Sequence, residues 1–375
     1  MKTRMKQLAL VLLALFFFAS CNNVKKDKDV IKIGVIAPLT GEAESFGKSM
    51  KNGILLLQDS INNLGGINEQ NIQFIFEDDK LSAKDGVNAF NKLVNVDKVQ
   101  AIIGSAASSI SLALLPKAND NNIVMISSIS TADDLKGKEN DCFFRVVPPN
   151  YKQGFTAVKF IIEDLKIDKI AILNANDDYG ISFANSIENN LKEKQITLVY
   201  KNSYNAGTKD FKNLLMQIKK TNPQVVILAG IIPETAVIQR QAVEANLNCI
   251  FISGDGSYSP NLFEIGGSAV EGSYYTVMAM PDDTSATYAR FVKAYFTKFN
   301  EQPDMWTAYS YDAALALITA IKESKEYNGT LIKNALFKID IEGVTGRIAF
   351  DKFGEVQRDY SLFVAKNGEF KLFKR

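Results

Sequence analysis

Short β-rich runs alternate with longer helical patterns along most of this chain, and this alternation constrains the fold more than any other feature. The apolar run "IKIGVIAPLTG" is followed by "SFGKSMKNGILLLQDSINNLGG", in which apolar residues recur at helical spacing until Gly65 and Gly66 end the pattern. Alternation at this spacing predicts an α/β fold with parallel sheets, helices on both faces and right-handed crossovers.

The alternation runs through two series, separated by the paired prolines Pro148 and Pro149. The first series continues through "NIQFIFEDD" and "VQAIIG", and the second runs from "FTAVKFIIEDLK" to "CIFISGDG". Two series imply two α/β lobes. The later helical segments, "ATYARFVKAYFTKFN" and "WTAYSYDAALALITAIKES", are expected to pack on the first lobe, and the final β-like segment to close the second. The expected lobes are 30–149 plus 279–360 for lobe 1 and 150–278 plus 361–375 for lobe 2.

Composition supports a folded chain without a dominant charge. Its 375 residues are 46% hydrophobic, enough to bury a sizeable core. Lys and Arg number 43 and Asp and Glu 42, which leaves a formal net charge of +1. Because no global field favours an anionic polymer, we expect no nucleic-acid partner.

The N-terminus has the layout of a secretory signal peptide. "MKTRMKQ" carries three positive charges, and "LALVLLALFFFA" is an apolar run of about twelve residues followed by "SCNN". This run is too short to span a bilayer as a stable helix. We therefore expect residues 1–21 to direct export.

Cys21 gives this segment a more specific interpretation. "FASC" resembles a bacterial lipobox, in which the cysteine is lipidated and becomes the mature N-terminus. Residues 22–29, "NNVKKDKD", would then form a solvated tether. The expected product is an exported lipoprotein of the cell envelope, held at the membrane by acyl chains; the alternative is an ordinary cleavage site beside a chance cysteine.

The remaining cysteines and the absence of histidine exclude several chemistries. Cys142 and Cys249 each precede an apolar run, so we expect small buried hydrophobes in separate strands rather than a disulfide. With no histidine, neither a Ser/His/Asp nor a Cys/His nucleophile can be assembled, and a zinc site would lack its commonest nitrogen ligand. We expect no enzyme activity, no metal and no cofactor.

Polar residues gather where predicted strands end. In "AIIGSAASS", Gly104 allows a turn, and Ser105 and Ser108 stand at a helix start that offers free N–H groups to a small anion. The alternative is that these serines only cap the helix. No Gly-Lys-Ser/Thr follows, which excludes a phosphate-binding P-loop.

Three later strand ends carry further candidates. Thr131 follows "VMISSIS", Tyr179 lies in "NANDDYG", and Asp255 lies between glycines in "ISGDGSYSP" with Tyr258 nearby. A tyrosine there can cover a ligand and an aspartate can meet a cation. Turn chemistry and strand-end packing are the alternative explanations.

Taken together, several segments resemble one family: "IKIGVIAPLTGEAESFG", "GGINEQNIQFIFEDD", "AIIGSAASS", "NDDYG", "ISGDG" and "WTAYSYDAALAL". Their order and spacing are similar to those of type I periplasmic binding proteins of the branched-chain amino-acid-binding group, over residues 30–375. The resemblance implies two Rossmann-like lobes joined by three crossovers. It also implies a ligand held between the lobes and delivered to an ABC permease in the inner membrane.

The resemblance assigns roles to individual residues. In that family the first lobe grips an α-carboxylate and part of the ammonium group, which implies Ser108 together with Thr131 and the backbone of Ile129. An acid from the second lobe completes the ammonium site, which implies Asp255. The family's covering tyrosine corresponds to Tyr179, and Phe46 stands where an aromatic residue closes the pocket.

Some positions depart from the family pattern. Ile231 replaces an aromatic residue of some amino-acid binders, Ile129 is bulkier than usual, and the cysteines of a first-lobe disulfide found in some members are absent. The expected function is capture of a small ligand, an amino acid with a branched-chain or other apolar side chain first, for an ABC permease. Alternatives are binding of an amide or organic acid, a ligand-sensing co-receptor and, less favoured, an enzyme.

Overall fold

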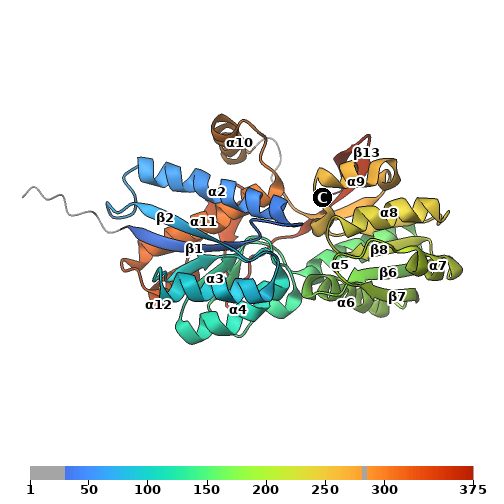
Figure 1. The fold of residues 1–375 in the computed structure, drawn as a ribbon, viewed down its shortest axis with the longest axis horizontal. Coiled ribbons are helices and arrows are strands. Elements are labelled where there is room, and N and C mark those ends of the chain that lie inside the picture. The colour runs from blue at the N-terminus through green and yellow to red at the C-terminus, as the bar shows by residue number, and fades with distance from the viewer. Residues whose placement is uncertain (1–29, 281–284, 375) are drawn as a thin grey trace, which may run out of the picture.

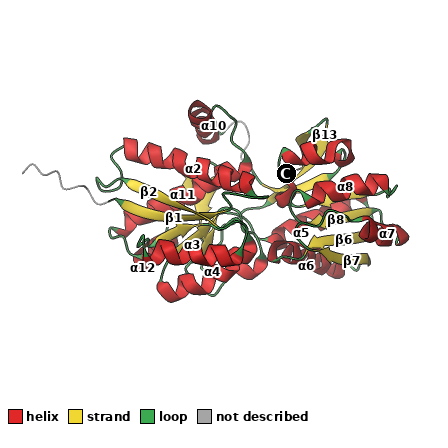
Figure 2. Cartoon of the chain, in the orientation of Figure 1, coloured by secondary structure: helices red, strands yellow, loops and turns green. Residues whose placement is uncertain are grey.

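The computed structural model describes residues 30–280 and 285–374, which form two lobes placed side by side (Figure 1). Each lobe has a central sheet with helices on both faces, as Figure 2 shows. This arrangement confirms the α/β fold predicted from the alternating pattern. The expected signal peptide, Cys21 and the tether at 22–29 lie outside the described residues.

The sheet of lobe 1 is wholly parallel and has the strand order β2-β1-β3-β4-β5. Its strands are β1 (Ile31–Ala37), β2 (Ile72–Asp78), β3 (Ala101–Ile103), β4 (Val124–Ser127) and β5 (Phe143–Arg145). The intervening helices are α2 (Glu44–Asn63), α3 (Ala83–Asn95), α4 (Ser108–Asn121) and the short 3₁₀ helix η1 (Asp133–Leu135). Strands buried on both faces explain why these runs are almost continuously apolar.

The sheet of lobe 2 has the order β14-β13-β10-β9-β8-β6-β7. Its parallel strands are β6 (Ile170–Ala175), β7 (Leu198–Tyr204), β8 (Val225–Ala229), β9 (Ile250–Ser253) and β10 (Tyr274–Met278). Its helices are α5 (Asn150–Phe160), the π-helical turn η2 (Ile161–Leu165), α6 (Asp178–Glu193), α7 (Lys212–Lys220), α8 (Glu234–Glu244), η3 (Asp255–Ser257), α9 (Asn261–Gly266) and η4 (Gly267–Val270). The hairpin of β13 (Tyr360–Lys366) and β14 (Glu369–Lys374) adds two antiparallel strands.

The chain leaves lobe 2 after β10 and returns to lobe 1 with three helices. These are α10 (Ala286–Phe299), α11 (Met305–Ser324) and α12 (Gly329–Leu336), followed by the small hairpin of β11 (Asp340–Gly343) and β12 (Gly346–Ala349). Helix α11 packs along α2, and β13 then re-enters the lobe 2 sheet. The chain therefore passes between the lobes after β5, after β10 and after β12, which agrees with the three crossovers that the resemblance implies.

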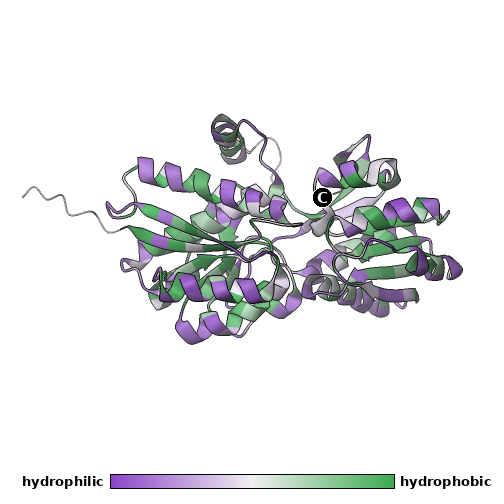
Figure 3. Ribbon diagram, viewed as in Figure 1, coloured by the Kyte–Doolittle hydropathy of each residue, from purple (hydrophilic) through white to green (hydrophobic). Residues whose placement is uncertain are grey.

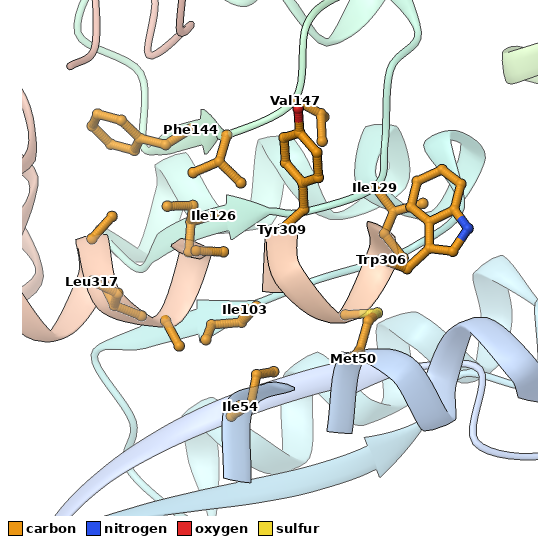
Figure 4. Packing of buried hydrophobic residues seen from close by; sticks show 14 of the residues in the cluster. Met50, Ile54, Ile103, Ile126, Ile129, Phe144, Val147, Trp306, Tyr309 and Leu317 are labelled. Atoms are coloured by element: carbon orange, nitrogen blue, oxygen red, sulfur yellow. The ribbon is translucent and has the colours of Figure 1, made fainter. Parts of the chain in front are cut away.

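Each sheet has a hydrophobic layer on both faces. In lobe 1, α2, α11 and α12 cover one face and α3 and α4 the other. In lobe 2, α5 and α6 cover one face and α7 and α8 the other. Apolar residues line these contacts while polar residues face outward (Figure 3). Figure 4 shows Met50 and Ile54 of α2 packed with Ile103, Ile126 and Leu317 in the lobe 1 core.

Two local details differ from expectation. The helix expected over "FTAVKFIIEDLK" already begins at Asn150, because Pro149 occupies the preceding position in extended conformation and the Asn150 N–H bonds to the Thr131 carbonyl instead. Cys142 and Cys249 are free thiols that precede β5 and β9 rather than lying within them. Cys142 is buried, whereas Cys249 is only half-buried, and burial raises its pKa to about 12.

Candidate functional site

A cavity of about 180 Å³ lies between the lobes. Its wall combines the helix-start side of lobe 1 with strand ends of lobe 2. The lining residues are Ala43, Phe46, Leu81, Ala83, Ala106, Ala107, Ser108, Ser109, Ile110, Ile129 and Trp306 from lobe 1, and Asp177, Tyr179, Ala206, Ile231, Asp255 and Gly256 from lobe 2. This volume is below the roughly 300–1,000 Å³ of sites for drug-sized ligands, so the cavity suits a small molecule.

The start of α4 forms one wall of the cavity. Ala107 is the N-cap residue and has no side chain that could satisfy the first N–H groups of the helix. Ser108 is 3% exposed, and its hydroxyl accepts a hydrogen bond from the Ala132 N–H at 3.2 Å. Because a helix start combines unpaired donors with a partial positive charge, this wall favours a small anionic group such as a carboxylate.

Ser105 lies behind this wall, outside the set of lining residues. Its hydroxyl donates to the Asp79 carboxylate at 2.6 Å and accepts the Ala107 N–H at 3.3 Å. The Ser105 carbonyl accepts the hydroxyls of Ser127 and Ser130. Ser105 was expected to touch the ligand, but its hydrogen bonds hold the loop that presents the start of α4.

Two of the expected site residues, Ile129 and Thr131, follow β4. Ile129 lines the cavity and is 8% exposed. Thr131 is 1% exposed, and its hydroxyl has no hydrogen-bond partner within the described part of the chain. Thr131 itself is not among the lining residues, although its carbonyl anchors the start of α5 through Asn150. A buried hydroxyl without a hydrogen-bond partner is energetically unfavourable.

Asp255 is the most heavily buried acid of the cavity wall, at 1% exposed. Its Oδ1 accepts hydrogen bonds from Tyr179 Oη at 2.6 Å, Gln153 Nε2 at 2.9 Å and the Gly256 N–H at 3.0 Å. Its Oδ2 has no partner among residues 30–280 and 285–374. Desolvation raises the pKa of Asp255, and the bonds from Tyr179 and Gln153 oppose that rise.

The flanking glycines explain how Asp255 fits there. A Cβ at Gly254 would lie 2.4 Å from Tyr179 Oη, and one at Gly256 would lie 2.7 Å from a side-chain carbon of Ile231. Larger residues at either position would displace the tyrosine or the cavity wall. The "SGDG" motif thus reflects the close approach of this turn to Tyr179 and Ile231.

Aromatic residues close the remaining sides. Phe46 and Trp306 meet edge to face, with ring centroids 5.3 Å apart and an interplanar angle of 66°. Tyr179 covers the lobe 2 side, and its pKa lies well above the ordinary value because of burial and the neighbouring Asp255. Tyr258 does not line the cavity; its ring packs on Phe370, with centroids 4.3 Å apart, and on Phe363.

Sequence reasoning missed three contributors. Trp306 belongs to the "WTAYSYDAALAL" segment used for the resemblance, but nothing in its helical pattern places it on the cavity side. Gln153 supports Asp255 from α5, and Asp177 lines the cavity while its carboxylate accepts the Gly180 N–H at 2.7 Å as the cap of α6. Of these three residues, only Asp177 could have been found from the sequence, because it is a polar residue directly before a predicted helix, where a helix cap is expected.

The described residues contain no group of three or more acids and cysteines placed to hold a metal ion. In the same part of the chain, no helix is both long enough and apolar enough to cross a membrane. The cavity wall instead combines the start of α4, which favours an anion, with Asp255, whose Oδ2 has no partner among the described residues. Apolar side chains line much of the rest.

A small cavity between two α/β lobes, walled by a helix start from one and a buried acid from the other, defines a two-lobed solute-binding protein. Residues 30–369 match the family model "Periplasmic binding protein". The chain belongs to this family, within the type I proteins of the Leu/Ile/Val-binding group. Membership of a family of solute-binding proteins confirms the prediction that the chain is not an enzyme.

Several relatives are similar over nearly the whole chain. A Leu/Ile/Val-binding protein homolog of Brucella abortus is 31% identical over 341 residues, covering 90% of this chain and 91% of its own. The crystal structure of a leucine-binding protein from Thermotoga maritima is 27% identical with a TM-score of 0.87, covering 92% and 97% of the two chains. A branched-chain amino acid transporter substrate-binding protein from Streptococcus pneumoniae, in complex with isoleucine, is 26% identical with a TM-score of 0.84, covering 92% and 100%.

Proposed function

We propose that this protein captures a small α-amino acid, with a branched-chain or other apolar side chain, in the cavity between its lobes. The observation that carries the proposal is the buried Asp255, whose Oδ2 lacks a partner among the described residues and which lines an otherwise largely apolar cavity. A buried carboxylate calls for a paired cation, and an ammonium group supplies one together with hydrogen-bond donors.

The opposite wall suits the other end of an amino acid. The N–H groups at the start of α4 and the Ser108 hydroxyl receive the α-carboxylate, and Thr131 with the Ile129 backbone shares the ammonium group with Asp255. Phe46, Tyr179 and Ile231 surround the apolar side chain. The cavity lining supports these roles for all of these residues except Thr131, which follows the lining residue Ile129 by two positions.

The proposed role includes delivery of the captured ligand to an ABC permease, and the name of one similar protein, a branched-chain amino acid transporter substrate-binding protein, supports a role in transport. Residues 1–21, with Cys21 as the lipidated residue, would export the protein and anchor it to the cell envelope. The proposed lobe boundaries are 30–149 with 279–360 and 150–278 with 361–375, and the cavity lining includes residues from both of these lobes. Closure on the ligand then follows from contacts made by both lobes at once.

A thermal-shift screen tests this function, using soluble protein that begins at Val24 with amino acids, amides and small organic acids. A ligand at 100 times its dissociation constant adds about 2.7 kcal/mol of stability, which shifts Tm by several degrees. We expect hits among neutral α-amino acids. Hits confined to acids or amides without an ammonium group would overturn the role of Asp255 and leave binding of another solute class.

The second candidate is a ligand-sensing co-receptor, which uses the same cavity without transport. Reconstituted uptake distinguishes the two. Vesicles that contain the cognate permease should accumulate the amino acid only when this protein is present. Binding without any stimulation of uptake would favour sensing.

A further inference from the structure

Leu81 differs in its exposure from the other large apolar residues that line the cavity. The others are buried or half-buried, whereas Leu81 is 38% exposed. Within the described lining, Ala83 and Ala206 are the other two exposed residues, one from each lobe. Lining residues that also reach solvent mark the opening of a cavity, so Leu81 is the one bulky side chain at this opening.

The backbone at Leu81 has an unusual conformation. Lys80 has φ 48° and Leu81 has φ 58°, which places two consecutive residues in the left-handed region. Residues other than glycine seldom adopt this region, and bulky side chains disfavour it. Such a conformation persists only where the surrounding structure fixes it, and ligand-binding sites are among the places where it recurs.

Two aspartates fix this turn. Asp78 is the last residue of β2, and its Oδ1 accepts the Lys80 N–H at 3.0 Å. Asp79 is fully buried; its Oδ1 accepts the Leu81 N–H at 2.9 Å, and its Oδ2 accepts the Ser105 hydroxyl at 2.6 Å. The turn is therefore tied both to β2 and to the loop before α4. Because the Leu81 N–H is taken up by Asp79, the part of Leu81 that remains for a ligand is apolar.

We propose that Leu81 covers the apolar side chain of the bound amino acid at the opening of the cavity, and that its bulk limits the size of the side chain the site accepts. This inference rests on the proposed function and adds a specificity-determining residue to it. Contact with the ligand would remove exposed apolar surface of Leu81 from water, which favours binding in proportion to the area buried.

The character of the opening favours the side chain over the charged end of the ligand. The three exposed lining residues, Leu81, Ala83 and Ala206, all have apolar side chains. A carboxylate or ammonium group held against them would lose water without gaining a partner. The polar features of the lining lie elsewhere, at the start of α4 and at Asp255.

The test compares amino acids that differ only in side-chain size: alanine, leucine and phenylalanine. In isothermal titration, Leu81→Ala should weaken leucine about tenfold, the effect of losing roughly two buried methylene groups. Alanine should change little because its methyl group is short, and phenylalanine should lose less than leucine because the opening is wider. Leu81→Phe should narrow the opening and weaken leucine while alanine binding is kept.

A third variant separates the side chain from the backbone. Asparagine adopts the left-handed region more readily than leucine does, so Leu81→Asn keeps the turn and removes the apolar cover. It should lose the same leucine affinity as Leu81→Ala with Tm at or above that of the unaltered protein. Leu64→Ala is the control, because Leu64 is 85% exposed and does not line the cavity, and it should change neither affinity nor size preference.

Three results would overturn the inference. Unchanged leucine affinity in Leu81→Ala would show that this side chain stays in solvent. Loss of affinity for alanine, leucine and phenylalanine by equal factors would show that Leu81 supports the loop without selecting the ligand. Both results leave the proposed function intact. Failure of the unaltered protein to bind any α-amino acid would overturn the proposed function and this inference together.

Discussion

The phenol of Tyr179 donates a hydrogen bond of 2.6 Å to Oδ1 of Asp255, while the second oxygen of that carboxylate is unpartnered among the described residues. Tyr179 lies at the start of α6, and Asp255 follows β9. The tyrosine therefore favours the ionised form of a buried carboxylate through one of its two oxygens.

Replacing Tyr179 with phenylalanine should weaken binding of an α-amino acid at least about tenfold, because a hydrogen bond to a charged group contributes about 1.5–3 kcal/mol. The Tyr179 bond lowers the pKa of Asp255, so its loss raises that pKa further. Affinity for an ammonium ligand falls as pH drops through this pKa, and the fall should begin at a higher pH in the variant. Calorimetry from pH 5 to pH 8 checks this, with the half-buried Tyr200→Phe, which does not line the cavity, as the control; superimposable pH profiles would contradict it.

Asp255→Asn should stabilise the ligand-free protein. Because desolvation raises the pKa of Asp255 above 3.8, the folded state holds its proton to higher pH than the unfolded chain does. Stability therefore decreases as pH rises from about 3.8 through the raised pKa and stays lower at neutral pH. Asparagine removes this penalty, with an expected gain on the order of 1 kcal/mol at pH 7.

Urea unfolding at pH 7 and pH 4 measures this effect. The gain should shrink at pH 4, where the wild-type carboxyl is increasingly protonated in both states. The exposed Asp168→Asn is the matched control and should change stability little at either pH. A destabilised Asp255→Asn protein at pH 7 would mean that the carboxylate is paired in the absence of ligand.

Arg145 and Glu355 form an ion pair beside the first and third crossings, with side-chain exposures of 1% and 6%. Arg145 also donates to the Ala132 carbonyl at 2.8 Å. Arg145→Met should destabilise the protein by about 3–5 kcal/mol, because it leaves a buried charge unpaired. Arg145→Met with Glu355→Leu should recover part of this loss.

Chemical denaturation measures the cost of breaking this pair. The control is the exposed pair of Arg347 and Asp340, whose disruption should change stability little because water screens the two charges. Equal effects of the two disruptions would show that the buried pair is solvated in the native protein.

Gly53→Ala should destabilise the contact between α2 and α11. A Cβ at Gly53 would lie 2.3 Å from the backbone oxygen of Thr307, which neighbours Trp306. Overpacking of this kind costs about 1–3 kcal/mol, and the displacement of α11 should also lower ligand affinity. Ser60→Ala, on the exposed part of α2, is the control. Unchanged Tm and affinity in Gly53→Ala would show that the helices separate without consequence.

Much of the fold followed from periodicity, because parallel strands buried on both faces leave continuous apolar runs between amphipathic helices. The β13–β14 hairpin has the same local β pattern as the parallel strands. The sequence alone therefore could not show that β13 and β14 pair antiparallel. The start of α5 at Asn150 depended on a backbone hydrogen bond to Thr131 in the other lobe, which no local pattern encodes.

Within the site, local sequence indicated strand ends but could not say which side chains face the cavity. Ser105 and Ser108 read alike as helix-start hydroxyls, yet Ser105 is taken up by Asp79 while Ser108 lines the cavity. Tyr258 follows Asp255 closely, but aromatic packing with Phe370 holds its ring elsewhere. The position of Trp306 at the cavity depends on the long-range contact between α2 and α11, which the local sequence does not show.

The most direct test of the central claim is calorimetric titration of the protein with its preferred α-amino acid and with the 2-hydroxy acid of the same carbon skeleton. These two ligands share the carboxylate and side chain and differ in the group that faces Asp255. The account predicts that the hydroxy acid binds at least about tenfold more weakly, and that this difference largely disappears in Asp255→Asn. Equal affinity of the two ligands for the unaltered protein would contradict recognition of an ammonium group by Asp255.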